Sequence, residues 1–393
     1  MPRFSAANTQ GLPLASLMAL AMAGFITILT EALPAGLLPQ MALDMDVPQT
    51  WIGQMITVYA IGSLVAAIPL TAATQGMRRR PLLLIAIAGF AVANTVTAFS
   101  TSYALTMSGR FLAGVSAGLL WALVAGYAAR MVPEHQKGRA IAVAMVGAPL
   151  AFSLGVPAGT FLGALVGWRM CFGAITLLTL VLIVWVRLGV PDFPGQPMGK
   201  RLSASKVITI PGVRPVLLVV LGFVLAHNIL YTYIAPFLVT VHMEERTDLV
   251  LLVFGVTSLL GIWIIGVLID RHLRGLTLVC TALFGLAALV VGAAANEPIA
   301  IYAAMSCWGL AFGGAPTLFQ TALANTAGEA TDFAQSMLVT TWNAAIAGGG
   351  VIGAVLLDHF GAAAFSPAVL LLLLITLVVV WSAKQAGFPL AAR

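Results

Sequence analysis

The sequence predicts an all-α integral membrane protein with twelve transmembrane helices in two pseudo-symmetric six-helix bundles. Three observations predict this fold class: the composition, the number of long apolar runs, and an internal repeat. Of the 393 residues, 61% are hydrophobic and only 8% are charged, and the mean hydropathy is +1.04. A soluble globular protein has about a quarter of its residues charged, so the composition excludes that class.

Twelve apolar runs follow one another along the chain, and each is long enough for one membrane-spanning helix, which needs about 20 residues. Away from the ends of the runs, the ionisable side chains within them are Glu31, Arg110 and His227. We expect the first six spans at residues 14–38, 50–73, 81–100, 104–128, 139–164 and 168–188. The second six are expected at residues 214–240, 249–269, 275–294, 299–323, 333–357 and 365–383.

Lys and Arg residues are divided unevenly between the two sides of the predicted membrane. With the N-terminus inside, sixteen of the 19 basic residues fall in cytoplasmic segments, while Arg169 and Arg246 lie outside. Cytoplasmic loops carry the excess of basic residues in membrane proteins. We therefore expect a multi-pass protein of a bacterial cytoplasmic (inner) membrane with both termini cytoplasmic. The net charge of +6 is a topology signal and does not indicate a nucleic-acid partner.

Sequence features recur along the chain at an offset of 195 residues. The pairs at this offset are Gln75 and Asp270 after spans two and eight, Gly114 and Gly309 in spans four and ten, and Gly155 and Gly350 in spans five and eleven. A polar, proline-rich stretch separates spans six and seven. We therefore expect an N-terminal six-helix bundle (1–190), a cytoplasmic linker (191–213) and a C-terminal six-helix bundle (214–393). Two such halves with a solute site between them are typical of an alternating-access carrier.

These motifs resemble the major facilitator superfamily across essentially the whole chain. The segment from Gly266 to Arg274, which contains Asp270 and Arg271, is similar to the loop signature of that superfamily. Its copy after span two has Gln75 where the signature usually has an acidic residue. The resemblance implies the major facilitator fold, and conformational roles for Gly266, Asp270 and Arg271.

Motifs in spans four and five point further into the superfamily. Arg110 is similar to the span-four arginine motif, and Gly147, Pro149 and Gly155 are similar to the span-five motif associated with antiporters. The segments Thr30 to Pro39, Gly167 to Met170, Ala226 to Phe237 and Ala330 to Asn343 resemble the twelve-span drug and sugar efflux branch of proton antiporters. Members of that branch export arabinose-like sugars, purine nucleosides or antibiotics. The resemblance implies proton-coupled efflux (antiport) of a small organic solute such as a sugar, nucleoside or drug by alternating access.

Glu31, Arg110 and His227 are the candidate proton-coupling residues. By helix rise, Glu31 lies about 10 Å and Arg110 about 9 Å below the outer surface. A carboxylate in hydrocarbon normally pairs, faces water or takes up a proton; the alternative is a gating carboxylate whose protonation never changes. Arg110 would form a pair with Glu31 when the cavity is closed to the outside, or donate to backbone carbonyls of span five, or do both.

His227 lies near the membrane midplane and has three possible roles. It would titrate as a second proton site, contact the substrate, or serve as a hydrogen-bonding group of the core. The candidate substrate-binding residues combine aromatic and amide side chains: His227, Asn228, Tyr231, Trp121 and Asn343. Such a set suits a sugar, a nucleoside or an aromatic drug equally well.

The expected partners are a small-molecule substrate, protons and membrane lipid, and we expect a monomer without cofactor or metal. No P-loop is present in the sequence, which argues against an ATP-driven pump. An enzyme within the membrane would need a cluster of His and carboxylate residues, so we expect no enzymatic activity. Two alternatives remain: an uncoupled or substrate-exchange facilitator of the same fold, and a membrane sensor or receptor, which the lack of a soluble output domain disfavours.

Overall fold

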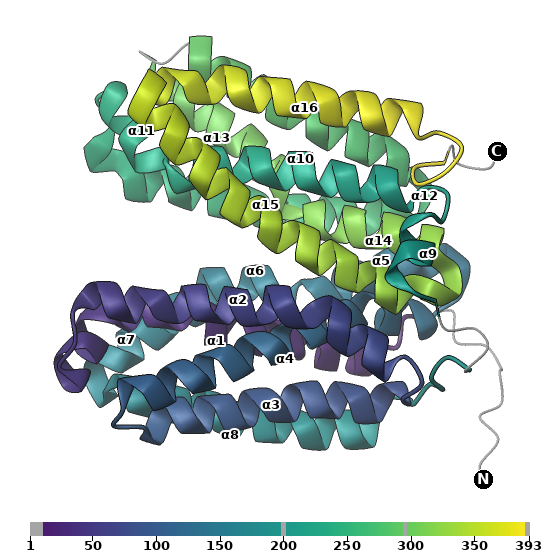
Figure 1. Ribbon diagram of the computed structural model, residues 1–393. Coiled ribbons are helices and arrows are strands. Elements are labelled where there is room, and N and C mark those ends of the chain that lie inside the picture. The colour runs from purple at the N-terminus through teal and green to yellow at the C-terminus, as the bar shows by residue number, and fades with distance from the viewer. Residues whose placement is uncertain (1–10, 198–201, 294–296, 390–393) are drawn as a thin grey trace.

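The computed structural model describes residues 11–197, 202–293 and 297–389, and those residues form helices and connecting turns without any strand. Two helical bundles lie side by side, one formed by α1 to α8 and the other by α10 to α16 (Figure 1). The predicted all-α class is confirmed.

The N-terminal bundle contains the first eight α-helices. They are α1 (Leu14–Met45), α2 (Gln49–Thr74), α3 (Arg79–Phe99), α4 (Tyr103–Arg130), α5 (Lys137–Met145), α6 (Gly147–Leu150), α7 (Val156–Val166) and α8 (Trp168–Gly189). A 3-10 turn, η1 (Glu134–Gln136), precedes α5, and a π-helical turn, η2 (Ala151–Gly155), joins α6 to α7.

After the short α9 (Ala204–Ile208), seven helices form the C-terminal bundle. They are α10 (Val213–Thr232), α11 (Ile234–Thr240), α12 (Thr247–Ala293), α13 (Pro298–Gly313), α14 (Ala315–Ala327), α15 (Thr331–Phe360) and α16 (Phe365–Ser382). The 3-10 turns η4 (Glu244–Arg246), η5 (Gly328–Ala330) and η6 (Ala362–Ala364) lie between them.

Ten helical ranges of the described residues are long and apolar enough to cross a membrane. Two of these ranges are long enough to cross more than once: Leu249–Ala293 has 45 residues and Pro298–Phe360 has 63 residues. The first contains a non-helical residue, His272, with φ −130° and ψ 26°. The second contains Gly328 with a positive φ of 53° and a ψ of −121°, which is not helical. The predicted twelve spans are therefore obtained when these two ranges are divided at His272 and Gly328.

Three spans that the sequence predicts as single helices are divided into shorter helices in the structure. Span five consists of α5, α6, η2 and α7, and it contains Pro149 and Pro157. Span seven breaks at Tyr233, shortly before Pro236, and span ten breaks at Gly314. Proline has no backbone N–H and disfavours helical geometry at the preceding residue, so it interrupts the regular hydrogen-bond ladder.

The internal repeat is visible in the packing of the helices. A Cβ atom on Gly114 of α4 would collide with the carbonyl of Tyr59 in α2, and one on Gly309 of α13 would collide with the carbonyl of Phe254 in α12. Tyr59 and Phe254 are themselves 195 residues apart. The same backbone contact is thus made once in each bundle. The repeat does not extend to the environment of Gly155, which meets the ring of Phe25, whereas Gly350 faces open space.

Buried side chains form two separate clusters. One draws on residues 17–190, together with Ile262 and Ala324, and the other on residues 207–388. The segment between the bundles makes specific contacts as well: the Tyr127 hydroxyl donates to the Pro191 carbonyl at 2.6 Å. Each bundle therefore has its own hydrophobic core.

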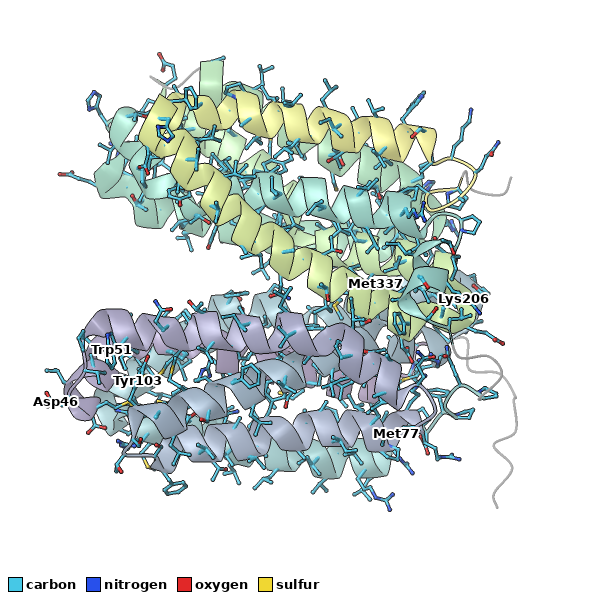
Figure 2. All side chains as sticks on the ribbon, in the orientation of Figure 1. Asp46, Trp51, Met77, Tyr103, Lys206 and Met337 are labelled. Atoms are coloured by element: carbon cyan, nitrogen blue, oxygen red, sulfur yellow. The ribbon has the colours of Figure 1, made fainter. Side chains whose placement is uncertain are left out.

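Basic side chains gather at the end of the molecule where α3 and α10 begin and α4 and α8 end. The described members are Arg78, Arg79, Arg80, Arg130, Lys137, Arg139, Arg187, Lys206, Arg214, Arg271, Arg274 and Lys384. We call this end the basic end. Figure 2 shows Lys206 and Met77 there, and Asp46, Trp51 and Tyr103 at the opposite end. Arg3, Lys200, Arg201 and Arg393, which contribute to the predicted orientation, lie outside the described residues.

Candidate functional site

The two bundles touch at the basic end and diverge towards the opposite end (Figure 1). The helix pairs in contact across the interface are α15 with α2 and α4, α14 with α4 and α5, and α12 with α5. The ends of these helices that lie at the basic end therefore form the contact between the halves.

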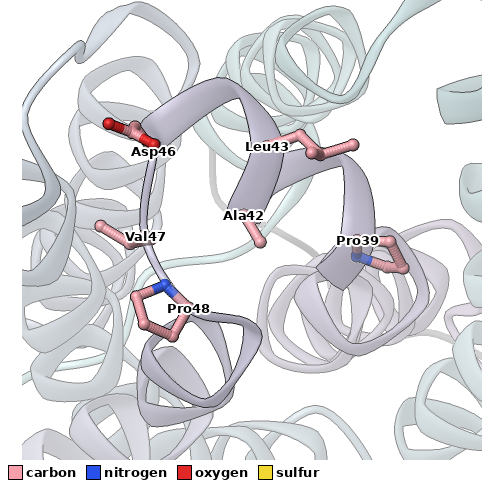
Figure 3. Close-up of a pocket in the computed structure, with 6 residues that line it drawn as sticks. All are labelled: Pro39, Ala42, Leu43, Asp46, Val47 and Pro48. Carbon is pink, nitrogen blue, oxygen red and sulfur yellow. The ribbon is translucent and has the colours of Figure 1, made fainter.

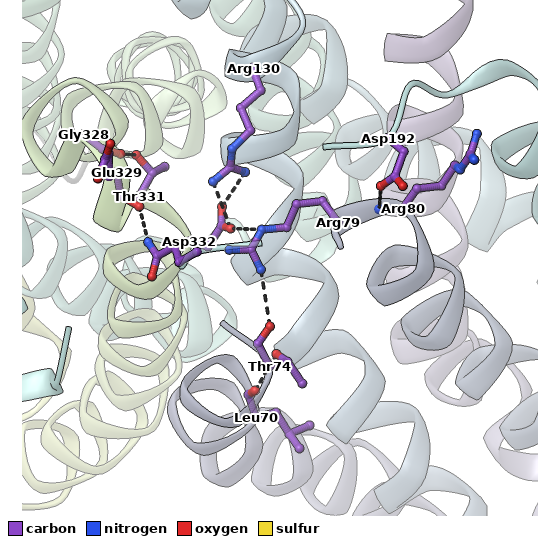
Figure 4. A network of polar contacts seen from close by, with 11 residues as sticks. Leu70, Thr74, Arg79, Arg80, Arg130, Asp192, Gly328, Glu329, Thr331 and Asp332 are labelled. Carbon is purple, nitrogen blue, oxygen red and sulfur yellow. Dashed lines mark hydrogen bonds and ion pairs between the residues drawn. The ribbon is translucent and has the colours of Figure 1, made fainter. Parts of the chain in front are cut away.

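A buried ion-pair network crosses this interface. Asp332 begins α15 in the C-terminal bundle and is only 2% exposed. Its Oδ2 atom lies 2.9 Å from Nε of Arg79, and its two oxygens accept hydrogen bonds of 2.8 and 3.0 Å from Arg130. One carboxylate thus lies between two guanidinium groups of the N-terminal bundle (Figure 4). Removing one partner of a buried pair leaves an uncompensated charge, so this network favours the arrangement in which the basic ends touch.

The sequence analysis did not identify this network. Asp332 was included only as part of a branch motif, and Arg79 and Arg130 only as topology charges. A signal was present, because an aspartate that begins a helix at an otherwise basic end stands beside many positive charges. Asp332 on α15 is 202 residues from Arg130 on α4, so the spacing alone does not pair them.

A second polar contact between the bundles involves the loop signature. Asp270 of α12 accepts the backbone N–H of Gly138 at 2.6 Å and that of Arg139 at 3.3 Å. These N–H groups belong to the first turn of α5, where a carboxylate is favourable for the helix dipole. Gly266 lies one turn earlier on α12 and faces Ala142 of α5 closely enough that a Cβ atom would be 3.1 Å away. Arg271 is exposed.

The span-five motif packs against α1. A Cβ atom on Gly147 would collide with the Ala21 carbonyl, and one on Gly155 would lie 2.8 Å from the ring of Phe25. The carbonyl of Pro149 accepts a hydrogen bond from the Ser153 hydroxyl at 2.8 Å. These residues therefore set the close approach of span five to α1.

Glu31 and Arg110 lie together between α1, α2 and α4. Arg110 is fully buried, and its guanidinium lies 5.2 Å from the centre of the Tyr59 ring. Glu31 is partly exposed, and the Tyr59 hydroxyl donates to the Thr27 carbonyl one turn earlier on α1 at 3.3 Å. Because α1 extends to Met45, Glu31 is fourteen residues from the helix end, which corresponds to about 21 Å. The helix α1 continues seven residues beyond the predicted end of span one, and the depth of about 10 Å below the outer surface stays a prediction.

Arg110 donates to backbone carbonyls of α1 and α2. Its hydrogen bonds go to the Thr30 carbonyl at 2.6 Å, the Glu31 carbonyl at 3.2 Å and the Met55 carbonyl at 3.5 Å. The expected acceptors in span five were wrong, because depth along a helix does not determine which neighbour a side chain faces. No Arg110–Glu31 carboxylate ion pair occurs in the described residues. That pair is predicted for the state closed to the outside, and it stays a prediction.

A proline explains why the Thr30 carbonyl is available to Arg110. In a regular helix this carbonyl would accept the N–H of residue 34, but that residue is Pro34. Proline removes this hydrogen bond and leaves the carbonyl unpaired. Arg110 supplies the missing donor from α4, and the Asn94 amide holds the Thr30 hydroxyl at 3.0 Å. Arg110 therefore stabilises α1 beside Glu31.

The C-terminal bundle holds an aromatic cluster at the equivalent position. The His227 ring of α10 stacks on Phe312 with a centroid distance of 3.5 Å, and Tyr231 lies at 5.1 Å. Phe254 lies at 5.9 Å and Trp308 at 5.2 Å from the same ring. We call these five residues the aromatic cluster. The sequence predicts His227 and Tyr231 as site residues but not the other three members, which come from α12 and α13.

Two amides lie on the neighbouring surfaces of α10 and α15. Asn228 donates to the Val224 carbonyl at 2.8 Å, and Asn343 donates to the Val339 carbonyl at 2.9 Å. The helices approach closely here, because a Cβ atom on Gly349 would lie 2.5 Å from Cβ of Asn228. The structure therefore brings Asn228 into the same region as His227. Trp121 lies apart in the N-terminal bundle, where its ring faces Gly24 of α1.

A surface pocket lies at the turn between α1 and α2, at the end opposite the basic end (Figure 3). Its lining residues are Pro39, Ala42, Leu43, Asp46, Val47 and Pro48. None of the candidate residues lines it.

The chain is similar to transporters in sequence and in fold. It is 26% identical over 340 residues to the purine ribonucleoside efflux pump NepI of Escherichia coli (strain K12), and 26% identical over 336 residues to the pump of that name in Shigella sonnei. Each match covers 85% of both chains.

Solved structures with a similar fold include the proton:xylose symporter XylE, with a TM-score of 0.78, 14% identity and coverage of 96% of this chain and 97% of the other. The transporter FucP in the outward conformation has a TM-score of 0.76, 15% identity and coverage of 94% and 99%. The family model of the Major Facilitator Superfamily matches residues 20–349. The chain is therefore a membrane transporter, not an enzyme, and belongs to the Major Facilitator Superfamily.

Proposed function

We propose that this transporter exports a small organic solute across the bacterial cytoplasmic membrane in exchange for protons. Purine ribonucleosides are the first solutes to test, because the efflux pumps to which the chain is similar are named for them. The observation that carries the proposal is that the two bundles have chemically different side chains at equivalent positions. An ionisable cluster of Glu31, Tyr59 and Arg110 lies in one bundle, and an aromatic cluster lies at the equivalent place in the other.

Alternating access requires two bundles that rock about a central site. The network at Asp332 and the contact at Asp270 hold the basic ends together, and the opposite ends diverge (Figure 1). The excess of basic residues in cytoplasmic loops argues that the basic end faces the cytoplasm. This arrangement is then the outward-facing state, with both termini in the cytoplasm.

Glu31 is the proposed proton carrier. It is partly exposed within the membrane-spanning part of α1. A carboxylate inside a membrane is energetically unfavourable, and such residues usually have a function. Arg110 cannot deliver a proton because a guanidinium stays charged. It is also occupied by backbone carbonyls, so it positions α1 and supplies positive charge beside Glu31.

The test is transport in proteoliposomes with radiolabelled inosine, comparing the parent protein with Glu31→Gln. A lumen more acidic than the bath should drive inosine uptake by the parent protein, because protons then leave as inosine enters. Glu31→Gln should lose this pH-driven accumulation and keep inosine exchange, since the amide preserves shape and hydrogen bonding. Asp46→Asn is the matched control. Asp46 is also an acidic residue of the α1 segment, but it caps the C-terminal end of the helix, fifteen residues after Glu31.

Two outcomes would contradict the proposal. Full pH-driven uptake by Glu31→Gln would remove Glu31 from the coupling mechanism. Inosine exchange without any response of the parent protein to the pH gradient would favour the alternative, an uncoupled or substrate-exchange facilitator.

A further inference from the structure

We propose that the aromatic cluster of the C-terminal bundle binds a planar heterocycle, and that Trp308 and His227 select rings whose edge carries a hydrogen-bond donor beside an acceptor. This inference rests on the proposed function and specifies the chemistry of its solute. It makes Phe254, Trp308 and Phe312 specificity-determining residues.

The first observation is that two buried polar atoms of the cluster have no partner. Within the described residues, Nδ1 of His227 and Nε1 of Trp308 are buried without any hydrogen bond. The rings that carry them are 5.2 Å apart. A buried polar group without a partner is unfavourable, so two such groups on neighbouring rings are an unfavourable way to fill a core. A ligand that pairs with both would recover this free energy.

The chemistry of the two atoms defines the ligand. An indole N–H only donates a hydrogen bond, so it requires an acceptor on the ligand. In the tautomer with the proton on Nε2, Nδ1 of His227 accepts and requires a donor. A purine substituted at its six-membered ring, such as hypoxanthine, presents a donor and an acceptor at neighbouring positions. A sugar ring, unlike a purine, has no aromatic π-face for the surrounding rings to stack on.

The second observation is that the N-terminal copy of the repeat has no aromatic residue at the positions equivalent to Trp308 and Phe312, although Tyr59 is equivalent to Phe254. At the offset of 195, the positions equivalent to Trp308 and Phe312 are Ala113 and Ala117. Both alanines are buried in the N-terminal bundle, which packs its helices with the same glycine contacts. Trp308 also stacks on Phe284 in the core at 5.5 Å. Because the N-terminal bundle forms without rings at these positions, the large rings of the C-terminal bundle point to a role in addition to helix packing.

Tyr231 provides the route into the cluster. Its side chain is 43% exposed, and its ring lies nearly parallel to that of His227, at 20° and 5.1 Å. Trp308, in contrast, is only 1% exposed. In this proposal, rotation of the exposed Tyr231 side chain opens the cluster, and the edge of a solute ring then reaches Nδ1 of His227 and Nε1 of Trp308.

The test measures binding to the purified transporter in detergent by isothermal titration, with three ligands. Inosine carries the ring and the donor–acceptor edge, unsubstituted purine riboside carries the ring without the donor, and ribose carries neither. Inosine should bind at least about tenfold more tightly than purine riboside, because purine riboside leaves buried groups unpaired. Ribose should show no measurable binding.

The variant Trp308→Phe then keeps a ring and removes the N–H. It should reduce the preference for inosine over purine riboside by at least about threefold and leave weak binding of both ribosides. Trp263→Phe is the matched control, since Trp263 is 68% exposed on α12, and it should keep the parent preference.

Equal affinity for inosine and purine riboside in the parent protein would overturn the inference, and so would binding of ribose as tight as that of inosine. Because the parent protein alone decides this, a variant that fails to fold does not obscure the result. The outcome is also separate from the proposed function. Selective binding of inosine without pH-driven transport would contradict proton coupling and leave this inference standing, whereas transport without selectivity would do the reverse.

Discussion

Arg110 and Pro34 should be energetically coupled, because one supplies the hydrogen bond that the other removes. The Thr30 carbonyl, which Pro34 leaves unpaired, accepts the Arg110 side chain at 2.6 Å. The variant Arg110→Met fills most of the same space with an apolar chain but leaves this buried carbonyl without a donor. That single loss should cost about 1–3 kcal/mol of unfolding free energy, in addition to the other contacts of the guanidinium.

Pro34→Ala restores a backbone N–H at the position that a regular helix uses. In that background the Thr30 carbonyl keeps a partner when Arg110 is replaced, so Arg110→Met should cost less by about 1–3 kcal/mol. The losses at the Glu31 and Met55 carbonyls and at the Tyr59 ring occur in both backgrounds, so they cancel in the comparison. The coupling therefore isolates one hydrogen bond.

The assay is reversible unfolding of the four proteins in detergent: the parent, the two single variants and the double variant. The double variant should be more stable than the sum of the two single effects predicts. Effects that add within about 0.5 kcal/mol would refute the reasoning, since independent sites add in this way. Pro39→Ala is the matched control, because Pro39 is also inside α1, whereas the Arg110 side chain donates to the carbonyls of Thr30, Glu31 and Met55.

Three further predictions concern the interface, the repeat and the connection near the basic end. Asp332→Asn removes one partner of a buried ion pair, which should destabilise the contact by about 3–5 kcal/mol. The distance between spin labels on α4 and α15 at the basic end, measured by electron paramagnetic resonance, should therefore lengthen. Gly114→Val and Gly309→Val should each cost about 1–3 kcal/mol in thermal stability, because each adds a side chain against a backbone carbonyl. Burial would raise the pKa of Asp192, but the hydrogen bond from Arg78 and nearby positive charge outweigh it and lower that pKa below its usual range. The stability lost in Asp192→Asn should therefore be seen at neutral pH and vanish as the pH falls below about 4.

Each of these predictions has a contrary result. Unchanged label distances in Asp332→Asn would show that the network does not hold the basic ends together. A loss at only one of the two glycines would contradict the structural equivalence of the bundles. A stability difference for Asp192→Asn that persists in strong acid would mean that the ion pair with Arg78 is not its source.

The helices were largely predictable because each span buries its backbone groups internally and shows as one apolar run. The expected span at 365–383 and the observed α16 (Phe365–Ser382) agree closely. Breaks within spans were not predicted, since apolar composition continues through Pro149, Pro236 and Gly314. The repeat was also predictable, because Gly114 and Gly309 serve the same backbone contact.

The site was predictable only in part, for a geometric reason. Glu31, Arg110 and His227 stand out as ionisable residues in apolar runs. Their partners do not, because Tyr59 and Phe312 are ordinary residues of apolar helices until the bundle brings them together. Helix rise gives depth but neither the facing helix nor the rotation of a side chain, and so the acceptors of Arg110 were assigned to the wrong span.

The glycine contacts of Gly114 and Gly309 have a mechanical consequence. Where two helices meet through side chains, a small shift can be absorbed by changes of rotamer before the neighbouring helix moves. At these glycines, helix backbone approaches helix backbone directly, with only the short Thr257 side chain also in contact at Gly309. The helix pairs α2–α4 and α12–α13 should therefore each move as one rigid body. A displacement at the basic end of either helix pair should therefore also move its opposite end. This rigidity lets a contact at one membrane surface control access at the other.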